Sequence, residues 1–195
     1  MKNFELKTTI IATISGLSYG QKYNENSKSF EEDRTSFQVQ SIIFKDSGEM
    51  VKKTLKVKKE VSEEQLKTMI GKTFDFSKIE EYSHNNNGFT TYTYSSEDFK
   101  PAKEQPKTPV FEVNKKLIIK VDNVIDNTNK NGVSTKLQTI VQDGLRTDLK
   151  TVKINDVKAT DLQNLKGKEV LITDLRVSKM NGKTYYSSNS KPEAI

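Results

Sequence analysis

The sequence predicts an all-β protein made of two similar units, each with five strands and one short helix in the order β-β-β-α-β-β. Apolar residues alternate with polar ones over short runs, as half-buried strands require. The same landmarks occur twice along the chain, and a proline-rich segment separates the two occurrences. With 195 residues, the chain is long enough for two domains of roughly 90 to 100 residues each.

The repeated landmarks come in the same order and at similar spacing. The first half carries Phe4-Glu5-Leu6, Leu66-x-x-Met69-Ile70-Gly71-Lys72 and Asn87-Gly88-Phe89-Thr90-Thr91-Tyr92. The second half carries Phe111-Glu112-Val113, Leu162-x-x-Leu165-Lys166-Gly167-Lys168 and Asn181-Gly182-Lys183-Thr184-Tyr185-Tyr186. Residues 100–109 hold three of the four prolines and read as a semi-extended linker. We therefore expect a first domain over 1–99 and a second over 110–195.

In the first half, alternating apolar residues predict strands at 6–14, 36–44 and 54–58. The period then changes to that of a helix. Ser62-Glu63-Glu64-Gln65 has the form of a capping box, and Gly71 fits the helix end. Two further strands are expected, over 73–79 and 89–94.

The second half repeats this order. Strands are predicted at 117–121, 137–141 and 151–154. A short helix is expected to open at Thr160-Asp161-Leu162-Gln163 and to end at Gly167. The last two strands are expected over 170–177 and 184–188.

Five strands with one helix between the third and the fourth is the arrangement of the oligonucleotide/oligosaccharide-binding fold, the OB-fold. The Gly after the helix, the tight Asn-Gly turn and the aromatic strand that follows it resemble the single-stranded DNA-binding proteins of phages, plasmids and bacteria. The resemblance covers nearly the whole chain apart from the linker. It implies two tandem OB-like barrels and sequence-tolerant binding of single-stranded DNA in the replication or recombination of a phage or plasmid.

The positive charge is concentrated in the second half. Residues 1–100 contain 15 Lys and Arg and 15 Asp and Glu, whereas residues 101–195 contain 17 and 11. The formal surplus of +6 therefore lies entirely in the second half. A basic half is typical of proteins that bind a polyanion, nucleic acid first and an anionic membrane surface second. A soluble basic domain without such a partner is the alternative.

Binding of single strands requires cations along the phosphates and flat rings for the bases. In the first half, rings and cations interleave on the long polar connection between the first two predicted strands. Local packing is the alternative for these rings, and the acidic run 31–33 would repel phosphate. Lys56 and Lys58 follow on the third strand, where a solvated edge is the alternative. The candidates of the first half are Tyr19, Lys22, Tyr23, Phe30, Arg34, Lys56, Lys58, Tyr92 and Tyr94, the last two forming a predicted pair of rings on one face.

The second half has fewer rings and more free cations. Its candidates are Lys120, Lys136, Arg146, Lys153, Lys183 and Tyr185. Tyr185 and Tyr186 are adjacent on a strand, so one faces inward and one outward, and the sequence does not decide which. The first half is therefore expected to stack bases and the second to hold the backbone.

Composition argues against other classes of protein. There is no Cys and only one His, so we expect no metal site, no cofactor and no enzyme. No apolar stretch approaches the roughly 20 residues that cross a bilayer. Polar residues interrupt the apolar run near the N-terminus, so we expect no signal peptide and a cytoplasmic location, that of the host cell if the protein is viral.

Three alternatives stay open at this stage. RNA is the alternative ligand, because nothing in the sequence detects a 2′-hydroxyl group. A β-rich structural or interaction protein is the alternative from a different class. Sugar binding is a third, because the same barrel supports it. The sequence does not predict the oligomeric state.

Overall fold

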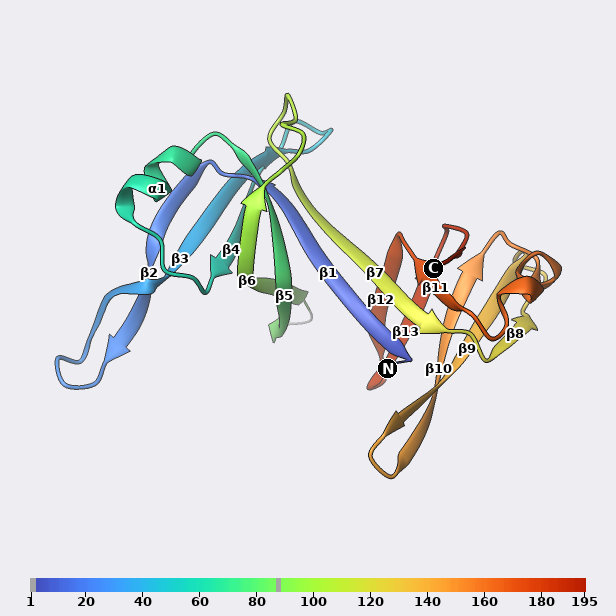
Figure 1. The fold of residues 1–195 in the computed structure, drawn as a ribbon. Coiled ribbons are helices and arrows are strands. Elements are labelled where there is room, and N and C mark those ends of the chain that lie inside the picture. The colour runs from blue at the N-terminus through green and yellow to red at the C-terminus, as the bar shows by residue number, and fades with distance from the viewer. Residues whose placement is uncertain (1–2, 87–88) are drawn as a thin grey trace. The chain divides into compact units, whose positions relative to one another are not determined.

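The computed structural model describes residues 3–86 and 89–195, and for residues 83–86, 89–92 and 143 it describes the backbone alone. Strands dominate the structure, as predicted (Figure 1). The chain forms two compact units. The first unit is Thr8–Val113, and the second unit is Asn114–Ile195 together with Met1–Lys7.

The two units differ from the predicted domains at both boundaries. Residues 1–7 begin the chain but belong to the second unit, and residues 100–113, which include the predicted linker, belong to the first. Within the predicted linker, the Gln105 side chain accepts a hydrogen bond from the Thr73 amide (2.8 Å) and donates one to the Thr73 carbonyl (3.1 Å). Part of the linker therefore packs on the first unit.

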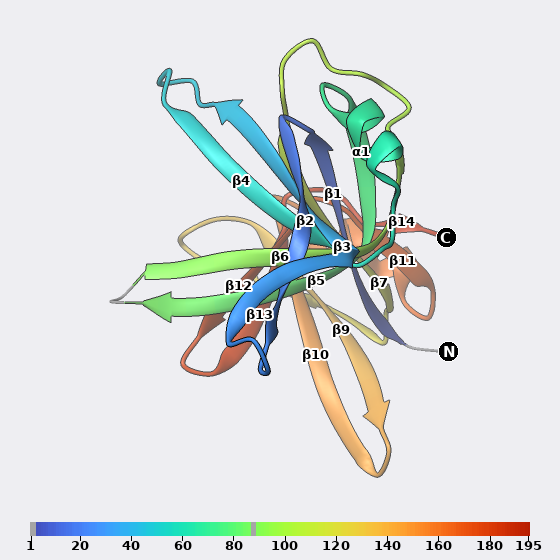
Figure 2. The same ribbon diagram turned by 90° about the vertical axis from the view of Figure 1, so that its left-hand side faces the viewer.

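The first unit is a single sheet with one short helix. Its elements are β1 (Phe4–Thr13, from Thr8 onward), β2 (Gly16–Asn24), β3 (Ser29–Phe44), β4 (Met50–Val57), α1 (Glu63–Met69), β5 (Thr73–Asn86) and β6 (Phe89–Pro101). The strand order is β1-β5-β6-β4-β3-β2. The β4–β6 pair is parallel, and the pairs β1–β5, β5–β6, β3–β4 and β2–β3 are antiparallel. Figure 2 shows the β3–β4 and β5–β6 hairpins extending as long two-stranded ribbons.

The two edges of this sheet meet at the corner between β1 and β2. Only Ile14 and Ser15 separate the two strands. The Ile14 amide donates to the Lys72 carbonyl (3.0 Å), and the Ser15 amide donates to the Gln40 carbonyl (2.8 Å). The corner is thus hydrogen-bonded to the start of β5 on one side and to β3 on the other. β1 and β2 therefore act as one bent strand of a five-stranded OB-like barrel.

The second unit repeats this topology. Its elements are β7 (Phe111–Lys120, from Asn114 onward), β8 (Asn123–Asp126), β9 (Ser134–Asp143), β10 (Arg146–Asn155), the 3₁₀ helix η1 (Ala159–Leu165), β11 (Glu169–Ile172), β12 (Leu175–Met180), β13 (Lys183–Ser188) and β14 (Glu193–Ala194). The order β12-β13-β10-β9-β8 again contains one parallel pair, β10–β13. At the matching corner, the Val121 amide donates to Lys168 (2.9 Å) and the Asp122 amide to Gln138 (2.8 Å).

Each unit has its own core beneath these strands. Ile10, Phe37, Leu55 and Phe76 lie in the first core, with about 1% exposure or less. The second core is built in the same way. Full burial of such a side chain stabilises the fold by about 1.5–3 kcal/mol. The buried residues of the second core are Leu117, Ile119, Val121, Leu137, Val152, Ile154, Leu162, Leu165, Val170, Ile172 and Leu175.

The capping box predicted for the first helix is confirmed. The Ser62 hydroxyl accepts from the Gln65 amide, and the Gln65 side chain accepts from the Ser62 amide, both at 3.2 Å. Gly71 follows with a φ of +81°, which only glycine adopts without strain. The matching segment of the second unit has no side-chain cap at Lys158 and forms the 3₁₀ helix η1.

One prediction about the first unit is wrong: the connection between its first two strands is not a polar loop. Residues 16–24 and 29–44 form a long antiparallel hairpin. Most of its residues from Gln21 to Arg34 are exposed, so no apolar period marked the strands. The register shifts between Tyr19 and Gly20, and a Cβ at Gly20 would clash with the Ser36 hydroxyl, so glycine is needed at this bulge.

Candidate nucleic-acid interface

The second unit carries a row of residues that lie side by side across four strands. Lys136 of β9 lies opposite Lys153 of β10, Lys153 opposite Ser187 of β13, and Ser187 opposite Arg176 of β12. We call these four residues the basic row. Their strand neighbours Leu137, Val152 and Leu175 are buried, so the basic row lies on the outer face of the barrel. With neighbouring strands about 4.8 Å apart, the row spans about 14 Å.

A groove of about 960 Å³ lies over this face. Lys136 and Lys153 line it together with Lys183 and Tyr185. Among the described residues, none of these three lysines makes an ion pair. Lys150 also lines the groove, but its ammonium group lies 3.2 Å from the Asp148 carboxylate. The groove therefore combines several uncompensated cations with an aromatic ring.

The structure decides which of the two adjacent tyrosines faces outward. Tyr186 packs against the second core and makes an edge-to-face contact with Phe4, with ring centroids 5.1 Å apart. Tyr185 is 46% exposed. Both tyrosines border the groove, and the ring of Tyr185 is the more exposed of the two.

The first unit has the same row of positions with a different charge. Gln38 of β3 lies opposite Lys56 of β4, Lys56 opposite Ser95 of β6, and Ser95 opposite Glu80 of β5. We call these four residues the neutral row. Its single cation and single anion cancel, whereas the basic row carries three cations and no anion. Strand order and register are the same, so the difference lies in the side chains alone.

Glu80 is held in place by three neighbours. Its carboxylate accepts hydrogen bonds from the Lys58 ammonium group, the Tyr82 hydroxyl (2.6 Å) and the Ser95 hydroxyl (3.2 Å). The Lys58 bond, followed by that from Tyr82, lowers the pKa of Glu80 to about 2, and Glu80 in turn raises the pKa of Lys58. Glu80 is therefore ionised throughout the physiological pH range. The ammonium group of Lys58, a predicted site residue, is neutralised by this carboxylate.

The candidates on the β2–β3 hairpin form a separate group. Tyr23 and Phe30 are 54% and 69% exposed, and their rings contact each other edge-on at 5.4 Å. Lys22 is exposed on the same hairpin and lies opposite Glu31. The hairpin thus presents an exposed pair of rings, but acidic residues lie among its cations.

Tyr19 and Arg34 line a smaller cavity of about 370 Å³ beside α1. The Arg34 guanidinium lies 5.4 Å from the centre of the Tyr19 ring and 2.8 Å from the Glu32 carboxylate. Lys67 and Glu63, which also line the cavity, are paired at 2.7 Å. The charges of this cavity cancel, in contrast to those of the groove.

The predicted pair of rings on β6 does not form an exposed platform around Tyr94. Tyr94 packs against the first core, and its ring centroid lies 6.4 Å from that of Phe111. The side chain of Tyr92 lies outside the described residues. Tyr94 occupies the same register position as Tyr186, since the two lie opposite Leu55 and Val152 in the two parallel pairs.

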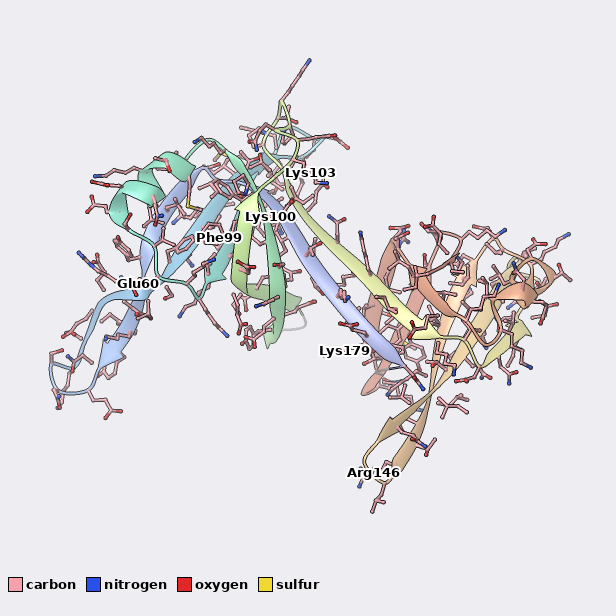
Figure 3. All side chains as sticks on the ribbon, in the orientation of Figure 1. Glu60, Phe99, Lys100, Lys103, Arg146 and Lys179 are labelled. Atoms are coloured by element: carbon pink, nitrogen blue, oxygen red, sulfur yellow. The ribbon has the colours of Figure 1, made fainter. Side chains whose placement is uncertain are left out.

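Two further candidates of the second unit lie away from the basic row. Lys120 is exposed at the end of β7 opposite Glu169. Arg146 is exposed at the start of β10, and Figure 3 shows it at the turn end of the β9–β10 hairpin. The structure thus gathers Lys136, Lys153, Lys183 and Tyr185 in one groove and leaves the other candidates dispersed.

Arg176, one of the free cations that the sequence shows in the second half, completes the basic row. Tyr82 was not among the sequence-based candidates; it is 47% exposed and lies opposite Thr93 on the first unit. Tyr185 lies opposite Ser178 at the matching position, so each face keeps one tyrosine, but on different strands. Tyr82 lies two residues after Glu80 on β5, so the two side chains share one face of the strand. The predicted strand ended at Ile79 and therefore did not include either residue, whereas β5 continues to Asn86.

Other kinds of site find no support in the part of the chain that the structure describes. No group of three or more His, Asp or Glu residues gathers there as a metal site. Within the same residues, no helix is long and apolar enough to cross a membrane.

Comparisons with known proteins give a distant structural likeness. No family model and no curated protein sequence matches the chain. Among solved structures, the chain is similar to a deletion variant of the single-stranded DNA binding protein from Thermus aquaticus, with 13% identity, a TM-score of 0.42, and coverage of 99% of this chain and 95% of that one. The wild-type protein from the same organism matches with 11% identity, a TM-score of 0.41, and coverage of 99% and 94%. At these values the likeness assigns no function to this chain.

Proposed function

We propose that this protein is a non-enzymatic, sequence-tolerant binder of single-stranded DNA that protects exposed strands during replication or recombination of a phage or plasmid. The observation that carries the proposal is the groove of the second unit, where uncompensated lysines and the exposed Tyr185 ring lie together. The cations would follow the phosphates, and the ring would stack on an unpaired base.

The position of the groove supports the same function. In OB-folds the ligand face consists of the second and third strands with the loop between the fourth and fifth. In the second unit these parts are β9, β10 and the turn at Asn181-Gly182, and residues from all three regions of the fold line or border the groove. The ring and the cations share one unit here, so the second unit does not need the first to supply stacking.

The test is fluorescence anisotropy with the full chain and labelled oligo(dT) of increasing length, at 50 and 200 mM salt. We expect binding that tightens with length until the barrels are covered, at about 4–16 nucleotides per barrel, and that weakens as salt rises. Competition by unlabelled oligo(dT), oligo(U) and duplex DNA of equal length identifies the ligand. Stronger competition by oligo(U) would assign RNA instead, and equal competition by duplex, or no binding at 50 mM salt, would reject the proposal.

A further inference from the structure

The basic and neutral rows differ in sign at one structurally equivalent position. Glu80 lies opposite Ser95, and Arg176 lies opposite Ser187. Both serines lie opposite a lysine on the neighbouring strand, Lys56 in the first unit and Lys153 in the second. The fourth position of the row is therefore an anion in one unit and a cation in the other, on an otherwise common framework.

The contacts of these two residues are also different. Glu80 accepts hydrogen bonds from Lys58, Tyr82 and Ser95, so it occupies the donors of its face. Among the described residues, Arg176 has no ion-pair partner and is exposed. Asn155 occupies the register position of Lys58 in the second unit. The second unit therefore has no cation at this position that an anion could neutralise.

An anion at this position works against phosphate in two ways. It repels the backbone directly, and it neutralises Lys58 and holds the Tyr82 hydroxyl, so these groups are not available to a ligand. Arg176 has the opposite effect, since it adds a third cation to Lys136 and Lys153 in one line. A strand laid across the basic row meets three positive side chains within about 14 Å, and one laid across the neutral row meets a net charge of zero.

We infer that the charge at this position, Glu80 or Arg176, contributes most to which unit binds the nucleic-acid backbone: the second unit is the primary phosphate-binding surface, and Glu80 keeps the same face of the first unit weak. The two faces differ by two charge units at this position and by only one unit at the position of Gln38 and Lys136. The inference rests on the proposed function. Residues 80 and 176 are specificity-determining residues that set the ranking of two similar faces.

The experiment uses the full chain with Arg176→Glu, Glu80→Arg and Glu80→Gln, and labelled oligo(dT) of about 30 nucleotides, enough for two barrels at the upper site size. For single strands, the slope of log K against log[salt] changes by about 0.7 for each phosphate contact. Arg176→Glu should reduce the slope by at least that amount. Glu80→Arg should steepen it by about 0.7, which changes the ratio of affinities at 50 and 200 mM salt by about 2.6-fold.

Glu80→Gln tests the loss of the carboxylate without the addition of a new cation. It keeps the size of the side chain, removes the negative charge and releases Lys58, so it should also strengthen binding and steepen the slope. Matched controls change the charge by the same amount elsewhere. Glu104→Arg and Glu104→Gln, in the exposed segment after β6, match the two Glu80 variants, and Lys191→Glu near the C-terminus matches Arg176→Glu. Thermal unfolding of each variant shows whether it folds.

The outcomes separate the inference from the proposed function. If the wild-type chain binds oligo(dT) and the variants at 80 and 176 shift the slope in opposite directions, beyond the controls, the inference holds. If the wild-type chain binds but Arg176→Glu and Glu80→Gln match their controls, the inference is overturned and the function stands. If the wild-type chain does not bind oligonucleotides at all, the function itself fails.

Discussion

The outer faces of the two barrels are built on one framework and differ in what they offer a ligand. Both have a parallel pair between the third and fifth barrel strands, and both place a lysine opposite a serine in that pair. Around this common centre, the second unit has Lys136 and Arg176, and the first has Gln38 and Glu80. Strand order and register therefore provide the same surface in both units, and the side chains at two positions of each face set its charge.

The largest expected effect comes from reversing the charge of the basic row. Lys136→Glu with Lys153→Glu should lower the affinity for oligo(dT) on the order of 100-fold at 50 mM salt and reduce the salt slope by about 1.4. The change at the same two positions of the neutral row, Gln38→Glu with Lys56→Glu, alters the charge by three units where the first pair alters it by four. It should cost less than about 5-fold, because that face has little net charge to lose. Anisotropy titrations measure both. Equal losses from the two pairs would show that the faces are equivalent.

The second prediction compares the two exposed tyrosines, Tyr185 and Tyr82, as stacking rings. Tyr185→Ala removes a stacking ring beside lysines and should cost about 1–3 kcal/mol, or roughly 5- to 150-fold in affinity. Tyr82→Ala on the first unit should cost less, because its ring lies beside Glu80. Tyr185→Phe is the control, since it keeps the ring and should bind nearly as well as the wild type. A larger loss from Tyr82→Ala than from Tyr185→Ala would contradict the proposed ranking.

A third prediction concerns stability and compares Phe4 with Phe111. Phe4 packs against the second core beside Tyr186, and Phe111 packs against the first core beside Tyr94. Both are partly buried, so each change to Ala should cost about 2 kcal/mol. Amide hydrogen exchange should accelerate mainly in the second unit for Phe4→Ala and mainly in the first for Phe111→Ala. The reverse pattern would show that the two segments are assigned to the wrong units.

The fourth prediction compares the N-terminal caps of the two helices, α1 and η1, and concerns small changes in the free energy of unfolding. Ser62→Ala removes the cap of α1 and should destabilise the first unit by about 1 kcal/mol, seen as a lower midpoint of urea unfolding. Lys158→Ser supplies a capping hydroxyl to η1 and should stabilise the second unit by a smaller amount, up to about 1 kcal/mol. No change from Ser62→Ala would mean that barrel packing alone holds α1.

Some of this could be predicted from the sequence because it depends on local chemistry. Ser62 and Gln65 form the predicted capping box. The order of strands and helix matches the prediction when β1 with β2, and β7 with β8, are each counted as one bent strand, but the strand expected over 170–177 is divided into β11 and β12, and β14 was not predicted. The short strand β8 (Asn123–Asp126) was missed because four residues, three of them exposed, carry no clear alternation. The part of the β2–β3 hairpin from Gln21 to Arg34 was missed for a related reason, since it extends beyond the core and almost all of its residues are exposed.

The parts of the site that could not be predicted depend on pairing between distant strands. Glu80 and Arg176 become equivalent only once the register of β5 with β6 and of β12 with β13 is known, and a slip by one residue would turn both side chains to the other face. Tyr94 and Tyr185 show the same limit, because the alternation within a strand gives two faces but does not say which one is the interior.

The assignment of residues 1–7 to the second unit has a consequence for how the molecule would respond to a protease. A single cut in the exposed stretch after Pro101 would leave an N-terminal fragment that still supplies Phe4 to the core of the second unit. If the cut falls before Phe111, the C-terminal fragment would still supply that residue to the core of the first unit. Nicked protein should therefore elute as one species under native conditions and come apart only in denaturant.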